Sequence, residues 1–422
     1  MNLKKAFSVK GYDQLDLYYQ EHNLRGITLE NNKIKNFECD VTGGVGIRAI
    51  VKGKIGFAYT TNLKKLIETV KQAITVAKFS NQNVTLKSYS KYKRPKGLFD
   101  KNVLKVGDRE LISSLNKAIS FAKKNKAIAA GGLNLSESST SYLNSEGLDL
   151  EEKDTEVSTS MDIIYKGVEA SWYDERRKYK DMVLPTITKS LNLAKQMSVK
   201  GNVKTGKYDV IFHPFALSQI LSYGLYPSFD ADFVQKGKSK LATKMSKKVF
   251  DEKLTINDNG LLEGGLSSET FDGDGVPVQD TLLVKNGVVK GFIYDLVRAQ
   301  KENKNSTGNA ARGYNVLPSV GISNFQIKPG RKEIIPEIDK GLLLYSPLNA
   351  HSINSITGDF SLGVMEALWI EKGEIKFAPK HVMISGNVFD LLKNIKLIGK
   401  DVIQTGSLVS PSIVAKTQII GE

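Results

Sequence analysis

Helical and strand-like segments occur in groups along this chain and do not alternate one by one. Apolar residues at helical spacing predict a helix that begins after Asn62, a good N-cap residue, and runs to Ala77. A second helix is expected from Asp108 and a third over 184–197, with strand-like sequence between them over 127–169. Segregated helices and strands are typical of α+β folds, so we predict mixed and antiparallel sheets with packed helices.

The length of 422 residues exceeds what a single compact core usually serves, so more than one region is expected. We predict an N-terminal α+β region over 1–200, which a linker near 87–105 splits in two. A larger, β-rich C-terminal region is expected over 207–422, where Asn286-Gly287 is a strong hairpin signal. The basic and aromatic stretch at 87–97 could stack on a single nucleic-acid strand, but its shortness favours an exposed linker.

Composition narrows the classes of function. Hydrophobic residues make up 41% and charged residues 25%, as in ordinary soluble proteins, and no apolar run approaches a membrane span. Cys39 is the single cysteine, which excludes an intrachain disulfide and a zinc site built from cysteines. The first residues show no signal-peptide pattern, so a cytoplasmic location is expected. The net charge of +15 is distributed in separate basic and acidic blocks, which gives little indication of nucleic-acid binding.

Familiar catalytic motifs are absent from the sequence. The histidines are far apart and no H-E-x-x-H occurs; His213 and His381, the latter in a strand-like run, are interpreted as structural. A serine nucleophile elbow is also missing. Asp230 and Asp232 follow an apolar helix in the stretch ILSYGLYPSFDADF. From residue chemistry alone, this pair could bind a metal, act as acid and base, or face solvent.

Several segments together resemble the TldD/PmbA family, whose older label is modulator of DNA gyrase. They are GGVGIRAIVKGKIGFAYTT, TGKYDVIFHPFAL, DFVQKGKSKL, STGNAAR and TGDFSLGVMEALWIEKGE. The resemblance implies a two-part α+β fold and a pair of related subunits. The resemblance implies that the TldD-like subunit is a zinc metallopeptidase, which carries an H-E-x-x-x-H helix. This subunit cleaves unstructured peptides. The PmbA/TldE-like subunit shares the fold and lacks the metal ligands.

The family's metal helix precedes an acidic run that corresponds here to the segment from Asp230 to Gly237. In that register Ser222, Tyr223 and Pro227 occupy the positions of the first histidine, the glutamate and the second histidine. Serine is a poor zinc ligand, tyrosine is not a carboxylate base, and proline has no donor atom. The resemblance therefore indicates a degenerate site with no metal, no cofactor and no catalytic residue.

The resulting prediction is a non-catalytic, PmbA/TldE-like subunit that pairs with a TldD-like metallopeptidase, or with itself, and helps to bind unfolded peptides. The candidate peptide-channel residues are Asp230, Asp232, Ser306, Thr307, Gly308 and Asn309. Two alternatives stay open. One is a self-sufficient peptidase of the same family with an atypical site, and the other is a nucleic-acid-associated regulator. Neither a membrane partner nor tight nucleic-acid binding is expected.

Overall fold

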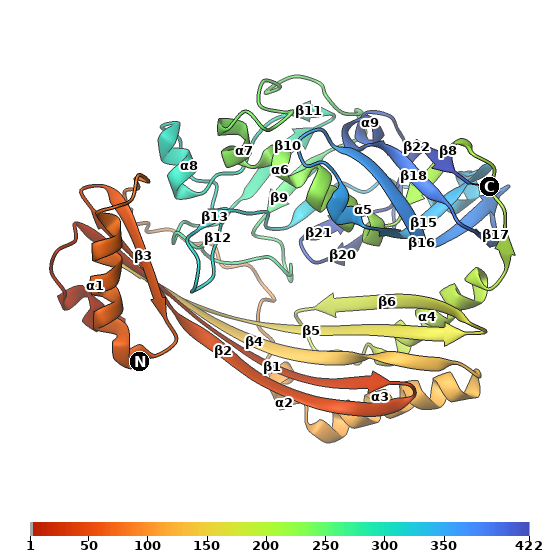
Figure 1. Cartoon of the computed structure of the whole chain (residues 1–422), viewed down its shortest axis with the longest axis horizontal. Helices are drawn as coiled ribbons and strands as arrows, with labels where there is room; N and C mark the ends of the chain where they lie inside the picture. The colour runs from red at the N-terminus through yellow and green to blue at the C-terminus, as the bar shows by residue number, and fades with distance from the viewer. Residues whose placement is uncertain (1–2, 422) are drawn as a thin grey trace.

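The computed structural model describes residues 3–421, and it has an α+β architecture (Figure 1). The N-terminal sheet is antiparallel and contains the first six strands of the chain. In spatial order they are β3 (Lys54–Thr60), β2 (Lys33–Val51), β1 (Gln14–Glu30), β4 (Ile128–Asn144), β5 (Asp149–Tyr165) and β6 (Val168–Arg176).

The remaining strands belong to the C-terminal half of the chain. One mixed sheet has the order β11 (Val288–Val289), β10 (Asp280–Lys285), β9 (Ile256–Asn259), β14 (Phe325–Ile327), β21 (Leu408–Ser410) and β20 (Ile403–Thr405). A second has the order β15 (Lys340–Leu348), β8 (Gly206–Phe212), β22 (Ile413–Ile420), β18 (Met383–Asn387), β16 (Asp359–Glu371), β17 (Glu374–Pro379) and β7 (Lys200–Gly201), with β19 (Ile395–Ile398) beside β22. A small ladder joins β12 (Ala310–Ala311) to β13 (Ser319–Val320).

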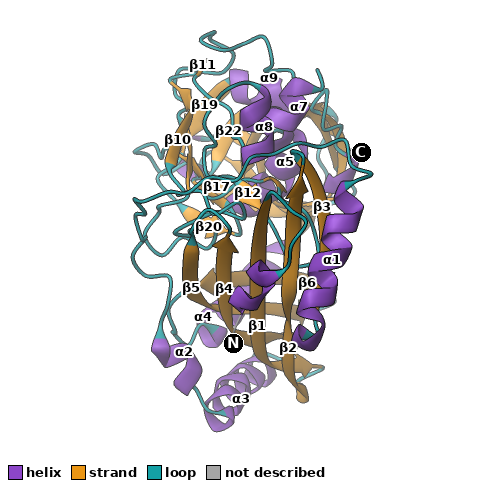
Figure 2. Ribbon diagram, turned by 90° about the vertical axis from the view of Figure 1, so that its left-hand side faces the viewer, coloured by secondary structure: helices purple, strands orange, loops and turns teal. Residues whose placement is uncertain are grey.

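The helices are α1 (Leu66–Ala77), α2 (Lys101–Lys105), α3 (Asp108–Lys124), α4 (Val183–Met197), α5 (Pro214–Gly224), α6 (Tyr226–Phe229), α7 (Ala231–Gln235), α8 (Leu296–Lys301) and α9 (Val388–Lys393). The longer helices α1, α3, α4 and α5 pack against these sheets (Figure 2). None of the helices between residues 3 and 421 is both long enough and apolar enough to cross a bilayer.

Local sequence signals account for many of these elements. Asn62 caps the turn before α1 by accepting a hydrogen bond from the Lys64 amide at 3.1 Å. The helices expected from Asp108 and over 184–197 are confirmed as α3 and α4. The Asn286-Gly287 hairpin is also confirmed, with both residues at positive φ. His381 differs from expectation: its φ of 42° places it in a turn between β17 and β18, outside either strand.

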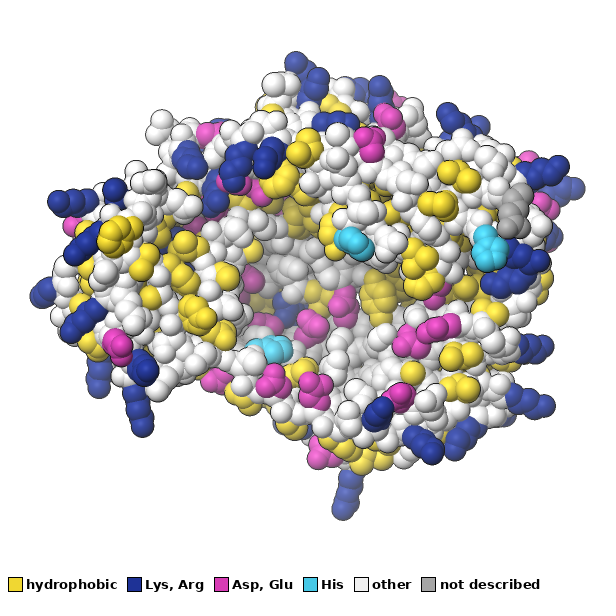
Figure 3. All heavy atoms as spheres, in the orientation of Figure 1, with side chains coloured by type: hydrophobic (Ala, Val, Ile, Leu, Met, Phe, Trp, Pro, Cys, Tyr) yellow, Lys and Arg dark blue, Asp and Glu magenta, His cyan; other side chains and the backbone are white. Residues whose placement is uncertain are grey.

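The N-terminal and C-terminal halves share one hydrophobic core around α4. Buried side chains of this core come from the N-terminal sheet, for example Leu133 and Val157, from α4, for example Leu191, and from the C-terminal sheet, for example Leu343 and Leu368. Burying apolar area is the dominant favourable term in folding, so α4 stabilises the two halves against each other. Their facing surfaces leave a cleft, visible as the central hollow in Figure 3.

Candidate functional site

A cavity of about 250 Å³ lies where the N-terminal sheet meets the C-terminal half, within this cleft. It is lined by Tyr18, Leu266, Ser267, Glu269, Asp272, Gly273, Val278, Gly308, Asn309, Ala310, Ala311, Arg312, Gly321, Ile322 and Ser323. Tyr18 comes from β1, and the other lining residues come from loops and short strands of the C-terminal half. The site therefore exists only when both halves of the chain are folded together.

Buried charges form the wall behind this cavity. Asp16 on β1 accepts hydrogen bonds from the Nε atom of Arg48 at 2.8 Å and from Arg312 at 3.0 Å. Arg48, on β2, also forms an ion pair with Asp274 at 2.7 Å, and the side chains of Asp16, Arg48, Asp274 and Arg312 are fully buried. Tyr142 donates to Asp16 at 3.3 Å. This network joins three N-terminal strands to the C-terminal half.

Asp272 and Asp274 belong to a tight turn that the network holds in place. The Asp272 carboxylate accepts hydrogen bonds from the amides of Val276 at 2.9 Å and Ala310 at 3.0 Å. Asp274 accepts one from the Leu296 amide, in the first turn of α8, at 2.9 Å. Burial, together with the nearby Asp274, raises the pKa of Asp272 well above its usual range. Asp272 and Asp274 are both buried. The sequence alone did not assign this turn to the site.

Glu269 is the acidic group on the open side of the cavity. Its side chain is exposed to solvent where it lines the cavity. Desolvation by the surrounding protein atoms, together with Glu152 and Asp154 nearby, raises the pKa of Glu269 to about 8. A carboxyl group with such a pKa is mostly protonated at neutral pH and can donate a proton to a bound ligand.

The cleft is acidic although the chain as a whole is basic, and acidic side chains gather in the hollow of Figure 3. Glu152, Asp154 and Glu156 alternate along β5 and so point from the same face of the sheet. Desolvation raises the pKa of each of these three carboxyl groups. Across the cleft, Glu366 on β16 accepts a hydrogen bond from the Ser171 amide at 2.7 Å, and burial raises its pKa to about 7. Such a lining favours cationic ligands.

The predicted channel residues at 306–309 divide into two pairs. Gly308 and Asn309 line the cavity, and Asn309 donates to the Gly321 carbonyl at 3.0 Å. A Cβ on Gly308, at φ +72°, would lie 2.6 Å from the Pro277 carbonyl oxygen, so only glycine fits there. Ser306 and Thr307 are outside the cavity lining, and both hydroxyls donate to the Tyr294 carbonyl, at 2.9 and 3.2 Å.

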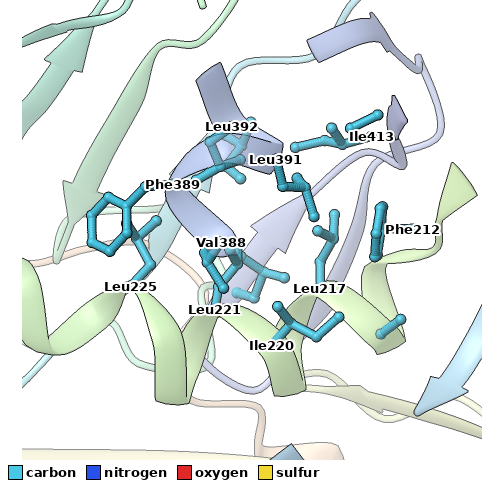
Figure 4. Packing of buried hydrophobic residues seen from close by; sticks show 14 of the residues in the cluster. Phe212, Leu217, Ile220, Leu221, Leu225, Val388, Phe389, Leu391, Leu392 and Ile413 are labelled. Atoms are coloured by element: carbon cyan, nitrogen blue, oxygen red, sulfur yellow. The ribbon is translucent and has the colours of Figure 1, made fainter. Parts of the chain in front are cut away.

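The proposed degenerate metal positions lie where α5 gives way to α6. Apolar residues of α5 face α9, and a Cβ on Gly224 would lie 2.6 Å from the Cγ2 atom of Val388 (Figure 4). Ser222 donates to the Gln219 carbonyl at 3.0 Å, and Tyr223 is 45% exposed. Pro227 lies in the first turn of α6, so the three positions are not on one continuous helix.

Asp230 and Asp232 have partners within the protein. Asp230 caps α7 by accepting a hydrogen bond from the Asp232 amide at 2.7 Å. Asp232 accepts one from Arg298 on α8 at 3.1 Å, and Arg298 also contacts Asp295 at 2.8 Å. Partial burial would raise the pKa of Asp232, but hydrogen bonds from Lys236 and Arg298 outweigh it and lower that pKa. Asp230 thus caps α7, Asp232 joins α7 to α8, and neither lines the cavity.

The segment 87–97 runs as a loop past the cavity. Tyr92 donates to the Gly275 carbonyl at 2.8 Å, and Tyr89 and Tyr92 pack against the buried cluster of Tyr18, Tyr142, Leu148 and Phe271. The Gly264 amide donates to the Lys96 carbonyl at 2.8 Å. The segment thus has no regular structure, as a linker would, while its tyrosines are fixed to both halves.

Among the residues from 3 to 421, no group of three or more His, Cys, Asp or Glu side chains is placed so as to hold a metal ion.

The residues that sequence reasoning missed are Asp16, Arg48, Glu269 and the Asp272 turn. Arg48 did carry a signal, because a charged residue interrupts the apolar run GIRAIV of β2. A charge in such a run usually has a buried partner.

This two-part fold, with a cleft between an antiparallel sheet and a β-rich half, matches a known class of protein. Residues 205–421 match the PmbA/TldA metallopeptidase C-terminal domain, and residues 15–77 match PmbA/TldA metallopeptidase domain 1. The chain therefore belongs to the TldD/PmbA family, as the sequence predicted.

Individual relatives agree over nearly the whole length. The chain is 34% identical to an uncharacterized protein of Methanocaldococcus jannaschii over 100% of both chains. It is 25% identical to a metalloprotease of the same organism, over 94% of this chain and 92% of the other. The crystal structure of TldE from Thermococcus kodakarensis superimposes with a TM-score of 0.91 at 26% identity, covering 99% of each chain.

Proposed function

We propose that this chain is a TldE-like, non-catalytic subunit that pairs with a TldD-like zinc metallopeptidase and helps to bind unfolded peptides. The main support for this proposal is that Ser222, Tyr223 and Pro227 occupy the expected metal-site positions, at the end of α5 and the start of α6. A metal helix must present two ligands and a carboxylate base from one face. These three side chains offer neither a good ligand nor a base, and they lie on two separate helices. The likeness to TldE over 99% of the chain supports the same assignment.

The cleft supports a role in peptide binding. It is lined by backbone groups of short strands and loops, such as Gly273 and Gly321, together with the carboxylates of the β5 face. An extended peptide bound mainly through its backbone needs few specific side chains. The carboxylates add a preference: a peptide rich in lysine and arginine gains favourable electrostatic energy in this cleft. We therefore propose unfolded, cationic segments as the preferred ligands.

Reconstitution tests the assignment. This chain alone should cleave nothing, and the mixture with a TldD-like partner should form a stable complex that cleaves unstructured peptides. A partner that is equally assembled and equally active without this chain would contradict the proposal. Ser222→His combined with Tyr223→Glu should leave the chain inactive by itself, because Pro227 still supplies no second ligand.

A second candidate function is a self-sufficient peptidase with an atypical site, and Glu269 is the observation that favours it. A carboxyl group with a pKa of about 8, in an open cleft, could serve as a general acid or base. In that case the purified chain would cleave peptides in the presence of a chelator, and Glu269→Gln would abolish the activity. Activity that disappears on further purification would rule this candidate out.

A further inference from the structure

A second cavity, of about 290 Å³, lies in the C-terminal half and shares no lining residue with the cavity in the cleft. We call it the basic cavity. Its lining comes from the segment before β9, the turn between β10 and β11, the loop after β14, and β19. The lining residues are Lys253, Thr255, Asn286, Lys328, Pro329, Gly330, Arg331, Lys332, Leu397 and Ile398. Four of them are cationic, and none of the residues from 3 to 421 that line the cavity is acidic.

The loop that follows β14 carries three of these cations, and its backbone is held on the protein. The Lys328 amide donates to the Thr255 carbonyl at 3.0 Å, and the Gly330 amide donates to the Gly399 carbonyl at 2.8 Å. A Cβ on Gly330 would overlap the Ile398 carbonyl oxygen, so the loop packs directly on the end of β19. The backbone that presents the cations is therefore fixed before any ligand binds, which lowers the entropic cost of binding.

Two of the four cations have no carboxylate partner. In the described part of the chain, no carboxylate forms an ion pair with Lys328 or Arg331, although both side chains are exposed on the same loop. Glu333, two residues after Arg331, pairs instead with Lys400 at 2.9 Å. Lys328 and Arg331 are thus cations whose charge the protein itself leaves uncompensated, and they attract an anion to the cavity.

The other two cations have partners that they can share with a ligand. Lys253 pairs with Asp251 at 3.2 Å, and Lys332 pairs with Glu337 at 3.0 Å. Both lysine side chains are largely exposed, and exposed ion pairs contribute little free energy, so a bound anion can compete for them. Four cations against two carboxylates leave an excess of two positive charges around the basic cavity.

The remaining lining offers a neutral donor and a small apolar surface. The Thr255 hydroxyl donates to the side-chain oxygen of Asn286 at 3.3 Å and accepts from the Asn286 amide at 3.2 Å. This contact orients Asn286 and leaves its Nδ2 group without a partner within residues 3–421. Pro329, Leu397 and Ile398 contribute apolar surface beside these donors.

We propose that the basic cavity binds a small phosphate monoester. The phosphate group lies between Lys328 and Arg331, with Asn286 as a neutral donor, and the organic part lies against Pro329 and Leu397. A phosphate monoester has a charge of about −2 at neutral pH and three acceptor oxygens, which matches the excess of two positive charges. The planar guanidinium of arginine fits two phosphate oxygens at once, and lysine adds a point charge.

Size and shape favour an ester over other phosphate-containing ligands. A volume of about 290 Å³ is near the lower end of small-molecule sites, so the cavity has room for an organic part beside the phosphate group. A nucleic-acid strand presents its phosphates in a row, and proteins that bind it usually carry a basic groove that follows the backbone. Here the cations gather around one cavity. The inference uses no residue of the cleft and is independent of the proposed pairing with a TldD-like subunit.

Isothermal titration calorimetry of the purified chain tests the proposal at an ionic strength of about 0.1 M. The phosphate probes are AMP, glucose 6-phosphate, inorganic phosphate and a short DNA duplex, with adenosine and glucose as phosphate-free controls. We expect at least one of the two esters to bind with a dissociation constant below about 1 mM, and at least about tenfold more tightly than inorganic phosphate. Adenosine and glucose should not bind.

Variants locate the binding site. Lys328→Gln combined with Arg331→Gln should weaken ester binding at least about tenfold, because two charge-assisted contacts are lost. Arg331→Lys keeps the charge and loses the fork, so it should weaken binding less. The matched control is Lys71→Gln combined with Lys78→Gln, which removes two exposed cations at α1 and should leave ester binding unchanged. Circular dichroism checks that each variant is folded.

Several results would overturn the proposal. If neither ester bound, or if inorganic phosphate bound as tightly as both esters, the cavity would not be a site for a phosphate monoester. Tighter binding of the DNA duplex than of either ester would indicate a nucleic-acid surface instead. Ester binding that survives the loss of Lys328 and Arg331, or that falls equally in the α1 control, would place the ligand elsewhere or reduce the effect to net charge.

Discussion

Arg48 offers the sharpest test of how the two halves are held together. Its guanidinium lies between two buried carboxylates, Asp16 on β1 and Asp274 in the C-terminal half, with ion-pair distances of 2.7 Å to Asp274 and 2.8 Å from Nε to Asp16. Arg48→Met keeps much of the volume and removes the charge. Arg312 still contacts Asp16, but the pairing of Asp274 is lost.

Removing one partner of a buried ion pair leaves an uncompensated charge, which typically costs about 3–5 kcal/mol of unfolding free energy. We expect a loss of this size for Arg48→Met, measured by urea denaturation with tryptophan fluorescence. Arg48→Lys keeps the charge but loses the forked geometry, so it should lose less. Asp274→Asn in the Arg48→Met background should recover part of the stability, because both charges are then gone.

A matched control is Lys52→Met, which removes a cation from an exposed position in the turn between β2 and β3. This substitution should change the free energy of unfolding by less than about 0.5 kcal/mol. If Arg48→Met cost less than about 1 kcal/mol, or if Asp274→Asn made it worse, the charge network would not stabilise the junction between the halves.

Three further predictions follow from individual residues. Gly224→Ala should destabilise the protein by about 1–3 kcal/mol because its Cβ would lie 2.6 Å from Val388. Gly107→Ala, whose Cβ meets nothing within 4 Å at the N-cap of α3, should cost less, and thermal unfolding compares the two. Burial raises the pKa of Glu366 from about 4.5 in the unfolded chain to about 7 in the folded protein, so folding favours its protonated form. The folded protein is therefore most stable, as far as Glu366 is concerned, below about pH 4.5, and it loses this stability as the pH rises through 7. Stability should therefore fall over that range, and less so in Glu366→Gln; an unchanged pH profile in the variant would contradict this. Elemental analysis of the purified chain should find no stoichiometric zinc, and one tightly held zinc per chain would refute the alignment of Ser222, Tyr223 and Pro227 with metal positions.

Local sequence was sufficient for several elements of this fold and of its site. The cap at Asn62, the helices α3 and α4 and the Asn286-Gly287 turn depend on neighbouring residues, so their signals lie within a few positions of sequence. Family membership was also readable, because motifs such as STGNAAR keep their order along the chain. The assignment of Ser222, Tyr223 and Pro227 to degenerate metal positions also comes from sequence alone, and it stays a prediction.

The cleft was decided by tertiary structure. Asp16, Arg48 and Asp274 lie far apart in sequence, and only the pairing of β1 with β2 and the docking of the Asp272 turn bring their charges into contact. The acidic lining is hidden for the same reason: Glu152 and Glu366 are ordinary surface residue types until the two halves face each other. The net charge of +15 gave no indication of this acidic lining, because a sum over the chain carries no information on position.

The roles of Asp230 and Asp232 also depend on which groups the fold brings within hydrogen-bonding distance of their carboxylates. Asp230 caps α7, and Arg298 of α8 contacts Asp232, because the fold brings α8 to α7. Hydrogen bonds and ion pairs act over a few ångströms, and the chain's path through space sets which groups come within that range.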